Sequence, residues 1–176
     1  DMRNLLDSQE PAARLAVESL QELDMHRTVQ LLVSGGIRSG ADVAKALALG
    51  ADAVAIGVAT LDALGCNKPV YLEDYHALGT EPGMCHHCHT GKCPVGVTTQ
   101  IPELQARLRP EQGARWLKNY LTVLTLEMQT LARACGKSHV HNLEPEDMVA
   151  LTVEAAAMAG VPLAGTDWIP GREARY

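Results

Sequence analysis

Two short apolar runs joined by a helical segment constrain the fold more than any other part of the chain. Residues 29–34 and 52–57 are mostly apolar, and the segment 41–49 between them places its apolar side chains on one helical face. A strand–helix–strand crossover implies parallel pairing, and parallel strands buried on both faces carry continuous apolar runs. Because two strands do not complete a parallel sheet, we expect this βαβ unit to be the C-terminal end of a larger α/β structure.

The remaining segments divide into helical and loop-rich parts. Apolar periodicity predicts a helix over residues 11–24, helical structure from about residue 103, and a last helix over about 144–160 with acidic residues at its amino end. Residues 60–102 carry four prolines and four of the five cysteines, and we expect residues 161–176 to be a loosely ordered tail. The predicted segments are the βαβ part with its phosphate site (1–60), a cluster loop (61–102) and a helical C-terminal segment (103–176).

Glycines follow both predicted strands. Gly35 and Gly36 come directly after the first strand, and Gly57 ends the second. Glycines there let backbone N–H groups approach a phosphate, and Arg38 can add a charge-assisted contact beside Ser34. The alternative is a tight turn that needs glycine for steric reasons alone. In a (β/α)₈ barrel the phosphate site lies after strands seven and eight, which the two runs would then be.

Cysteines are concentrated in one short stretch. Cys85, Cys88 and Cys93 fall within nine residues, and Cys66 precedes them. Soft thiolates at turn-compatible spacing are the ligands of iron–sulfur clusters and of zinc. An odd cysteine count with a tight cluster argues against a disulfide framework and for a reducing compartment, so we expect a cytoplasmic protein.

Other interpretations of this stretch are open. Zinc accepts four thiolates, or thiolates together with imidazoles from the neighbouring loop histidines. Cys85 and Cys88 could instead form a dithiol redox pair, although no thioredoxin-like context surrounds them. Cys135 is most simply an apolar residue near a helix end. The histidines in question are His86, His87 and His89.

Charge and composition exclude two classes of partner. The formal net charge is −6 and aromatic residues make up only 3% of the chain, so neither a basic stripe nor a base-stacking surface for nucleic acid is present. The longest apolar run, residues 53–59, is far too short to span a membrane.

Three segments together resemble one protein family. Residues 31–57 resemble the last two barrel strands of FMN-dependent hydroxy-acid oxidases, type 2 isopentenyl diphosphate isomerase, inosine monophosphate dehydrogenase and glutamate synthase. Cys88-x₄-Cys93 followed by Pro-Val-Gly resembles the cluster loop of glutamate synthase in particular. Residues 136–151 resemble the C-terminal segment of archaeal-type glutamate synthase and N-methylglutamate synthase large subunits. The chain departs from the family pattern at Pro82, where a cysteine is usual, and Leu64-Gly65-Cys66 matches the upstream segment instead.

The resemblance implies a fold, cofactors and ligands. The fold would be α/β, the C-terminal portion (strands seven and eight) of an FMN-binding (β/α)₈ barrel, followed by a cysteine-rich cluster loop and C-terminal helices. Three thiolates would hold a [3Fe–4S] cluster as in the family, and four could hold a [4Fe–4S] cluster. The FMN phosphate would be bound by Ser34, Gly35, Gly36, Arg38 and Gly57, and the cluster ligands would be Cys66, Cys85, Cys88 and Cys93.

The implied activity is reductive amination of 2-oxoglutarate to glutamate, with electrons passing from a partner through the cluster to FMN. Partners would be the rest of the barrel, a glutaminase or amidotransferase, and electron-donor subunits in a hetero-oligomer. No catalytic acid or base is assigned, since such residues would lie on earlier strands. The alternatives are an N-methylglutamate synthase subunit using methylamine, a non-catalytic electron-transfer or zinc-stabilised assembly subunit, and a zinc-stabilised barrel fragment of a nucleotide dehydrogenase.

Overall fold

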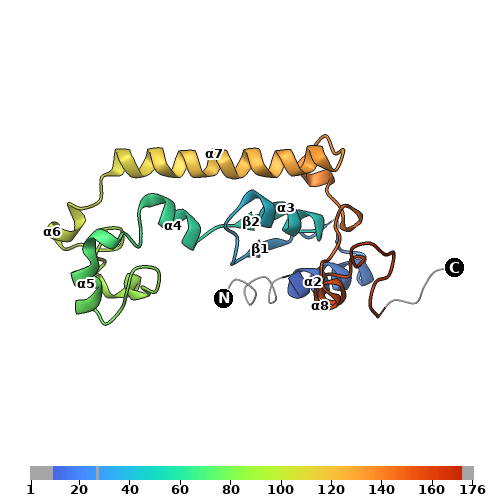
Figure 1. Cartoon of the computed structure of the whole chain (residues 1–176), viewed down its shortest axis with the longest axis horizontal. Helices are drawn as coiled ribbons and strands as arrows, with labels where there is room; N and C mark the ends of the chain where they lie inside the picture. The colour runs from blue at the N-terminus through green and yellow to red at the C-terminus, as the bar shows by residue number, and fades with distance from the viewer. Residues whose placement is uncertain (1–9, 27, 172–176) are drawn as a thin grey trace. The chain divides into compact units, whose positions relative to one another are not determined.

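A computed structural model describes residues 10–26 and 28–171 of the chain (Figure 1). The chain divides into two compact units. The first, called the sheet unit, is formed by residues 1–56 and 123–176, and the second, called the cysteine unit, by residues 57–122. The long helix α7 (Pro110–Ala134) begins in the cysteine unit and ends in the sheet unit.

The predicted βαβ unit is present in the sheet unit. Strand β1 (Leu32–Ser34), helix α3 (Gly40–Ala48) and strand β2 (Ala53–Ala55) follow one another, and the two strands pair in parallel. Parallel pairing is therefore confirmed, although each strand is shorter than the apolar run that predicted it. These two strands form a two-stranded sheet in the described residues, so the structure shows a small parallel sheet in a mixed α/β fold.

Helix α3 is held by burial of its small side chains. Val43, Ala44, Leu47 and Ala48 are buried, and Ala44 and Ala48 pack with Ala132 and Leu143 from the C-terminal part of the sheet unit. Gly40, at the start of α3, lies so close to α7 that an added Cβ would be 2.6 Å from the Met128 amide nitrogen. Only glycine fits this approach of one helix backbone to another.

A second cluster joins the two ends of the described chain. Helix α2 (Glu10–Glu22), which confirms the helix predicted over 11–24, contacts α8 (Val153–Ala159). The Arg14 guanidinium donates to the Ala157 carbonyl oxygen at 2.9 Å and to the Glu18 carboxylate at 2.8 Å. Helix α8 also contributes Ala156 and Ala159 to an apolar core that contains Leu49, Ala150 and Val161.

The single helix predicted over residues 144–160 is wrong. The segment is instead split into the 3₁₀ turn η4 (Pro145–Asp147) and α8, after a further turn, η3 (Val140–Asn142). Between η4 and α8, Ala150 forms a parallel bridge with Leu163, and the Ala150 N–H donates to the Pro162 carbonyl oxygen at 2.8 Å. This pairing also anchors the start of the predicted loose tail, where Val161 is only 1% exposed. Residues 172–176 of that tail lie outside the described residues.

The cysteine unit, whose first part the sequence predicted to be loop-rich, contains several short helices joined by turns and loops. Its turns are tight because glycines adopt positive φ angles where the chain reverses, as at Gly65 (φ 104°) after α4. At Gly96 (φ 84°) an added Cβ would also collide with the Leu104 carbonyl oxygen. Before α7 its elements are α4 (Val58–Leu64), η1 (Pro69–Tyr71), α5 (Leu72–Ala77), η2 (His87–Thr90) and α6 (Pro102–Gln105).

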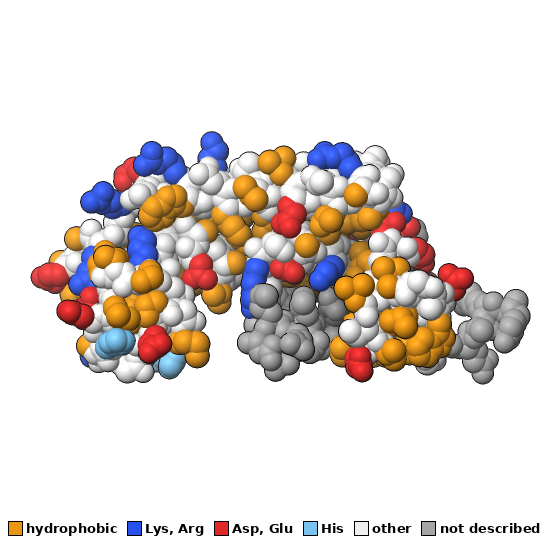
Figure 2. All heavy atoms as spheres, viewed as in Figure 1, with side chains coloured by type: hydrophobic (Ala, Val, Ile, Leu, Met, Phe, Trp, Pro, Cys, Tyr) orange, Lys and Arg blue, Asp and Glu red, His pale blue; other side chains and the backbone are white. Residues whose placement is uncertain are grey.

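Helix α7 confirms the predicted C-terminal helical segment, but only part of its apolar stripe is covered. Leu124 and Ala132 are buried, whereas Leu121 is 40% and Leu131 37% exposed. Figure 2 shows apolar side chains reaching the surface along this helix. An apolar side chain is also exposed on β1, where Leu32 is 63% exposed.

Candidate functional site

Four cysteines of the cysteine unit share one neighbourhood. Cys66 follows α4, Cys85 lies in the loop after α5, Cys88 is in η2, and Cys93 begins the Cys-Pro-Val-Gly turn. Cys66 is electrostatically coupled to Cys88 and Cys93, and Cys85 packs against a small core that contains Cys93. The structure therefore brings together the four thiols that the sequence singled out.

The turn after Cys93 surrounds its sulfur with hydrogen-bond donors. Cys93 is buried, and burial raises the pKa of its thiol, but the backbone N–H groups of Thr98, Val95 and Val97 lower it by more, so that the net shift is downward. The Thr98 hydroxyl adds to this lowering. A loop whose amides converge on a sulfur stabilises the thiolate form, which is the form that binds metal.

Cys66 has the opposite electrostatic environment. Burial raises the pKa of its thiol to about 11, and the charges of Asp62, Cys93 and Cys88 add to this effect, while the Asn67 N–H opposes it. Several thiolates held close together repel one another, so a bound cation is needed to remove their protons and neutralise the excess charge. The arrangement is thus suited to cation binding and unsuited to four free thiolates.

Three buried polar atoms beside the cysteines lack partners. Within the described residues, the Tyr75 hydroxyl, the Thr98 hydroxyl and the Asn67 amide oxygen make no hydrogen bond of ordinary geometry. Tyr75 is 1% exposed and packs with Cys93 and Val95. Burial, and then the charges of Cys66, Cys85 and Cys93, raise the pKa of Tyr75 to about 12. The two hydroxyls are donors, and buried donors next to thiols indicate a site built around an acceptor that the protein chain does not supply, whereas the Asn67 oxygen is an acceptor.

Arg107 fixes the cysteine turn to helix α5. Its guanidinium donates at 2.7 Å both to the Asp74 carboxylate of α5 and to the Pro94 carbonyl oxygen, which directly follows Cys93. The same group lies 4.4 Å from the ring centre of Tyr71. This clamp sets the distance between α5, which carries Tyr75, and the sulfur of Cys93.

The thiols do not converge on a single point. In the part of the chain that the structure describes, no group of three or more His, Cys, Asp or Glu side chains is arranged to hold a metal ion. Two of the histidines considered as zinc ligands pack against each other: His86 is exposed and stacks on His87, with ring centres 4.7 Å apart. Cys135 directly follows the end of α7, near a helix end as predicted, and it is exposed.

The predicted phosphate-binding residues lie at the turn after β1. Ser34 is the last residue of β1, and Gly35 (φ 100°) and Gly36 (φ 61°) both adopt left-handed conformations that favour glycine. No hydrogen bond from the Gly35 or Gly36 N–H is found among the described residues. Gly57, two residues after β2, is exposed, and an added Cβ there would have no atom within 4 Å.

The amino end of α3 is occupied by carboxylates of the chain itself. Ser39 caps α3, and the Asp42 carboxylate accepts from the Arg38 and Ser39 N–H groups at 3.0 Å. The Gly40 N–H donates to the Glu127 carboxylate at 2.7 Å. These helix donors are therefore engaged, and those left for a phosphate are at Gly35 and Gly36. Ser39 followed by Asp42 at the third position is the sequence signature of a capping box, whereas no local pattern points to Glu127.

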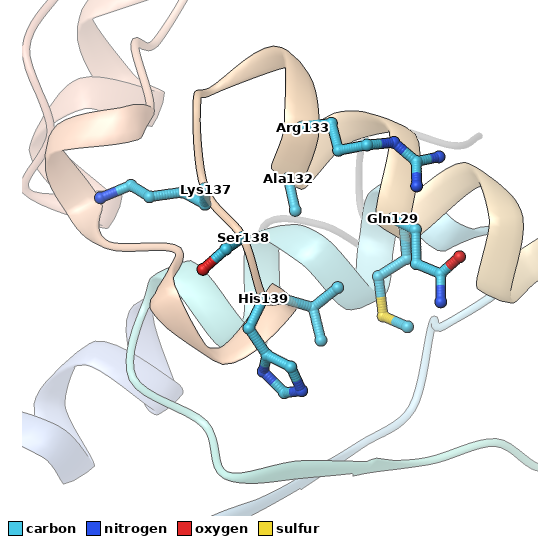
Figure 3. A pocket seen from close by; sticks show the side chains of 8 residues that line it. Gln129, Ala132, Arg133, Lys137, Ser138 and His139 are labelled. Atoms are coloured by element: carbon cyan, nitrogen blue, oxygen red, sulfur yellow. The ribbon is translucent and has the colours of Figure 1, made fainter.

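A pocket lies in the sheet unit, apart from the candidate site residues that the sequence singled out. It encloses about 240 Å³ at the end of α7 and includes Arg133, Ser138 and His139 in its lining (Figure 3). Lys137, also in the lining, is engaged by Glu144 at 3.1 Å and Asp147 at 3.2 Å, and in Figure 3 its ammonium points away from His139. These contacts, led by that with Glu144, raise the pKa of Lys137. Lys137 is thus already paired, and Arg133 is the cation of this lining for which the described residues give no carboxylate partner.

Comparison with known proteins gives consistent matches. Residues 10–138 match a family model described as "Conserved region in glutamate synthase". A glutamate synthase large subunit-like protein of Rhizobium meliloti is 67% identical over 159 residues, covering 90% of this chain and 36% of that protein. An archaeal glutamate synthase [NADPH] of Methanocaldococcus jannaschii is 40% identical over 126 residues, covering 72% of this chain and 22% of that protein.

A third relative, an archaeal-type glutamate synthase [NADPH] of Dehalococcoides mccartyi, is 38% identical and covers 87% of this chain and 28% of its own length. The chain thus spans about a third or less of these curated relatives. No solved structure matches it. Within the described residues, no helix has both the length and the apolarity that crossing a membrane requires.

Proposed function

The chain belongs to the glutamate synthase family, and we propose that it is the cluster-binding and flavin-phosphate-binding part of a glutamate synthase-type oxidoreductase. The activity of the whole protein would be reductive amination of 2-oxoglutarate to glutamate. When bound, an iron–sulfur cluster and FMN together supply the conversion between one-electron and two-electron transfer that this chemistry requires. The observation that carries the proposal is the set of four thiols in one neighbourhood beside buried, unpartnered hydroxyls.

The cysteine unit fits an iron–sulfur cluster in its chemistry. Cys66, Cys85, Cys88 and Cys93 would hold it, since thiolates are the usual ligands of such clusters. The amides around Cys93 provide donors toward sulfur, which is how protein loops stabilise and tune these centres. The hydroxyls of Tyr75 and Thr98 add donors that have no other acceptor within the described residues.

A structural zinc ion has less support from the same residues. Zinc draws four donor atoms to about 2.0–2.3 Å from one point, and the described residues contain no such convergence. Ligands of a multi-iron cluster bind separate iron atoms, so their sulfurs stay farther apart. Four neighbouring thiols that do not meet at a point suit the cluster better than the zinc ion.

The turn after β1 fits the phosphate end of FMN. Ser34, Gly35, Gly36 and Arg38 would bind it, together with Gly57 after β2. Two observations support this. The N–H groups of Gly35 and Gly36 donate no hydrogen bond within the described residues. Both glycines also adopt left-handed backbone conformations. Asp42 and Glu127 occupy the amino end of α3, so the phosphate would be bound by the turn itself and not by the helix terminus.

The remaining parts of the enzyme would come from outside this stretch of sequence. Exposed Leu32 on β1 supports pairing or packing with further barrel strands. Those strands would carry the 2-oxoglutarate site and the acid–base groups, and glutaminase and electron-donor components would complete a hetero-oligomer. The cysteine-rich site fits a reducing, cytoplasmic setting.

Substitution of a single ligand tests the cluster. We expect Cys93→Ser, in the protein purified anaerobically with its natural partners, to lose most of its iron and its visible cluster absorbance while FMN stays bound. Cys135→Ser is the matched control, because Cys135 is exposed at the end of α7, and it should keep its iron. Unchanged iron in Cys93→Ser would refute the assignment.

A further inference from the structure

The buried hydroxyl of Tyr75 has no acceptor for its proton in the part of the chain that is described, and only the Asn67 N–H is placed to donate weakly toward its oxygen. Tyr75 is 1% exposed, and its ring packs with Cys93 and Val95, with Cys85 against the same core. A buried hydroxyl is almost always hydrogen-bonded, because leaving it unpaired forfeits its hydration without return. Some acceptor must therefore be expected at this position in the working protein.

The groups nearest to the hydroxyl identify that acceptor. The thiols of Cys66, Cys85 and Cys93 are all close enough to act on it electrostatically. A tyrosine hydroxyl keeps its proton at neutral pH and can donate it in a hydrogen bond, and metal-bound sulfur is a negatively charged acceptor. The phenol therefore has a proton to donate, and metal-bound sulfur is the acceptor that these neighbouring side chains would supply.

The position of the ring is fixed from two sides. The Tyr75 carbonyl oxygen accepts from the Leu78 and Thr80 N–H groups, both at 3.0 Å, which closes the end of α5. Arg107 ties α5 to the cysteine turn through Asp74 and the Pro94 carbonyl oxygen. The hydroxyl is thus held relative to Cys93 by hydrogen bonds on both elements, as expected of a donor whose geometry matters.

We propose that Tyr75 is a positioning residue whose hydroxyl donates a hydrogen bond to the sulfur shell of the iron–sulfur cluster and thereby raises the reduction potential of the cluster. The inference rests on the proposed function, since it requires the cluster. Its physical basis is that reduction adds negative charge to the sulfurs, so that a hydrogen bond to sulfur stabilises the reduced form more than the oxidised form. The Thr98 hydroxyl, which also acts on the Cys93 sulfur, would act in the same sense.

The test is an EPR-monitored redox titration of the complete protein with its partners. Tyr75→Phe removes only the oxygen and should lower the midpoint potential, with the ratio of reduced to oxidised cluster at fixed potential falling about tenfold, which corresponds to ~59 mV for one electron. Tyr71→Phe is the matched control, because Tyr71 packs against the same core but its hydroxyl is not among the buried atoms that lack a partner, and its potential should not move. Pulsed EPR after exchange into deuterated water should show an exchangeable proton near the cluster that is lost only in Tyr75→Phe.

A second variant keeps the test valid if Tyr75→Phe fails to assemble. Fluorotyrosine at position 75 preserves the ring and makes the hydroxyl a stronger donor, so the midpoint potential should shift upward. An intact cluster with an unchanged potential in either variant would overturn the inference and leave the proposed function standing. Absence of iron from the wild-type protein would instead refute the proposed function itself.

Discussion

Replacement of Gly40 by alanine tests how the sheet unit is packed. The added Cβ would lie 2.6 Å from the Met128 amide nitrogen and 2.8 Å from the Glu127 Cβ, where ordinary contact begins at 3.4 Å. Because two of the three nearest atoms belong to the α7 backbone, relief requires α3 and α7 to separate, and overpacking of this kind costs about 1–3 kcal/mol. Separation also stretches the 2.7 Å hydrogen bond from the Gly40 N–H to the Glu127 carboxylate.

The expected net effect is a loss of about 2 kcal/mol in local stability, which is a ~30-fold increase in local opening. Hydrogen exchange measured by mass spectrometry on the full protein reports this directly as faster exchange in α3 and the C-terminal half of α7. Gly113→Ala is the matched control, because its nearest contact is an ordinary 3.4 Å to the Leu64 side chain. At position 113 the better helix propensity of alanine should raise local helix stability by up to about 1 kcal/mol. Hydrogen exchange in that part of α7 should therefore be slower than in the wild type. Equal protection of α3 in wild type and Gly40→Ala would refute this packing argument.

Two further substitutions test the two loops. Gly36→Val should abolish retention of FMN in gel filtration, because a β-branched side chain disfavours the left-handed backbone at φ 61° and fills the turn; undiminished flavin would count against the phosphate site, and Ile37→Val serves as control. Gly96→Ala should lower iron content and loosen the cysteine turn by about 1–2 kcal/mol, because φ is 84° and the Cβ would meet the Leu104 carbonyl oxygen; native iron and native exchange rates there would contradict it.

Local patterns predicted those parts of the fold that depend on neighbouring residues. The βαβ unit follows from apolar runs separated by a helical period, and both the parallel pairing and the helix over residues 11–24 are confirmed. The helix predicted over 144–160 is wrong because Ala150 pairs with Leu163. An alanine within an apolar period gives no sign of a strand-like partner beyond the next helix.

Part of the candidate site could also be predicted from local sequence, and part depends on packing between distant segments. The spacing of Cys85, Cys88 and Cys93 was enough to expect neighbouring thiols, and the family resemblance added Cys66. Tyr75 and Arg107 were not expected to matter, because their roles arise only when α5 packs against the cysteine turn. No sequence motif marks a tyrosine whose hydroxyl lacks a partner, since that property depends on burial by residues from several segments.

The most direct test of the account is the metal and flavin content of the wild-type protein, purified anaerobically with its natural partners, together with its EPR spectrum. We expect about one FMN and three or four iron atoms per chain, with the spectrum of a [3Fe–4S] or [4Fe–4S] cluster. Stoichiometric zinc without iron or flavin would contradict it, because the four cysteines would then hold a structural ion and the glycine turn would bind no cofactor phosphate.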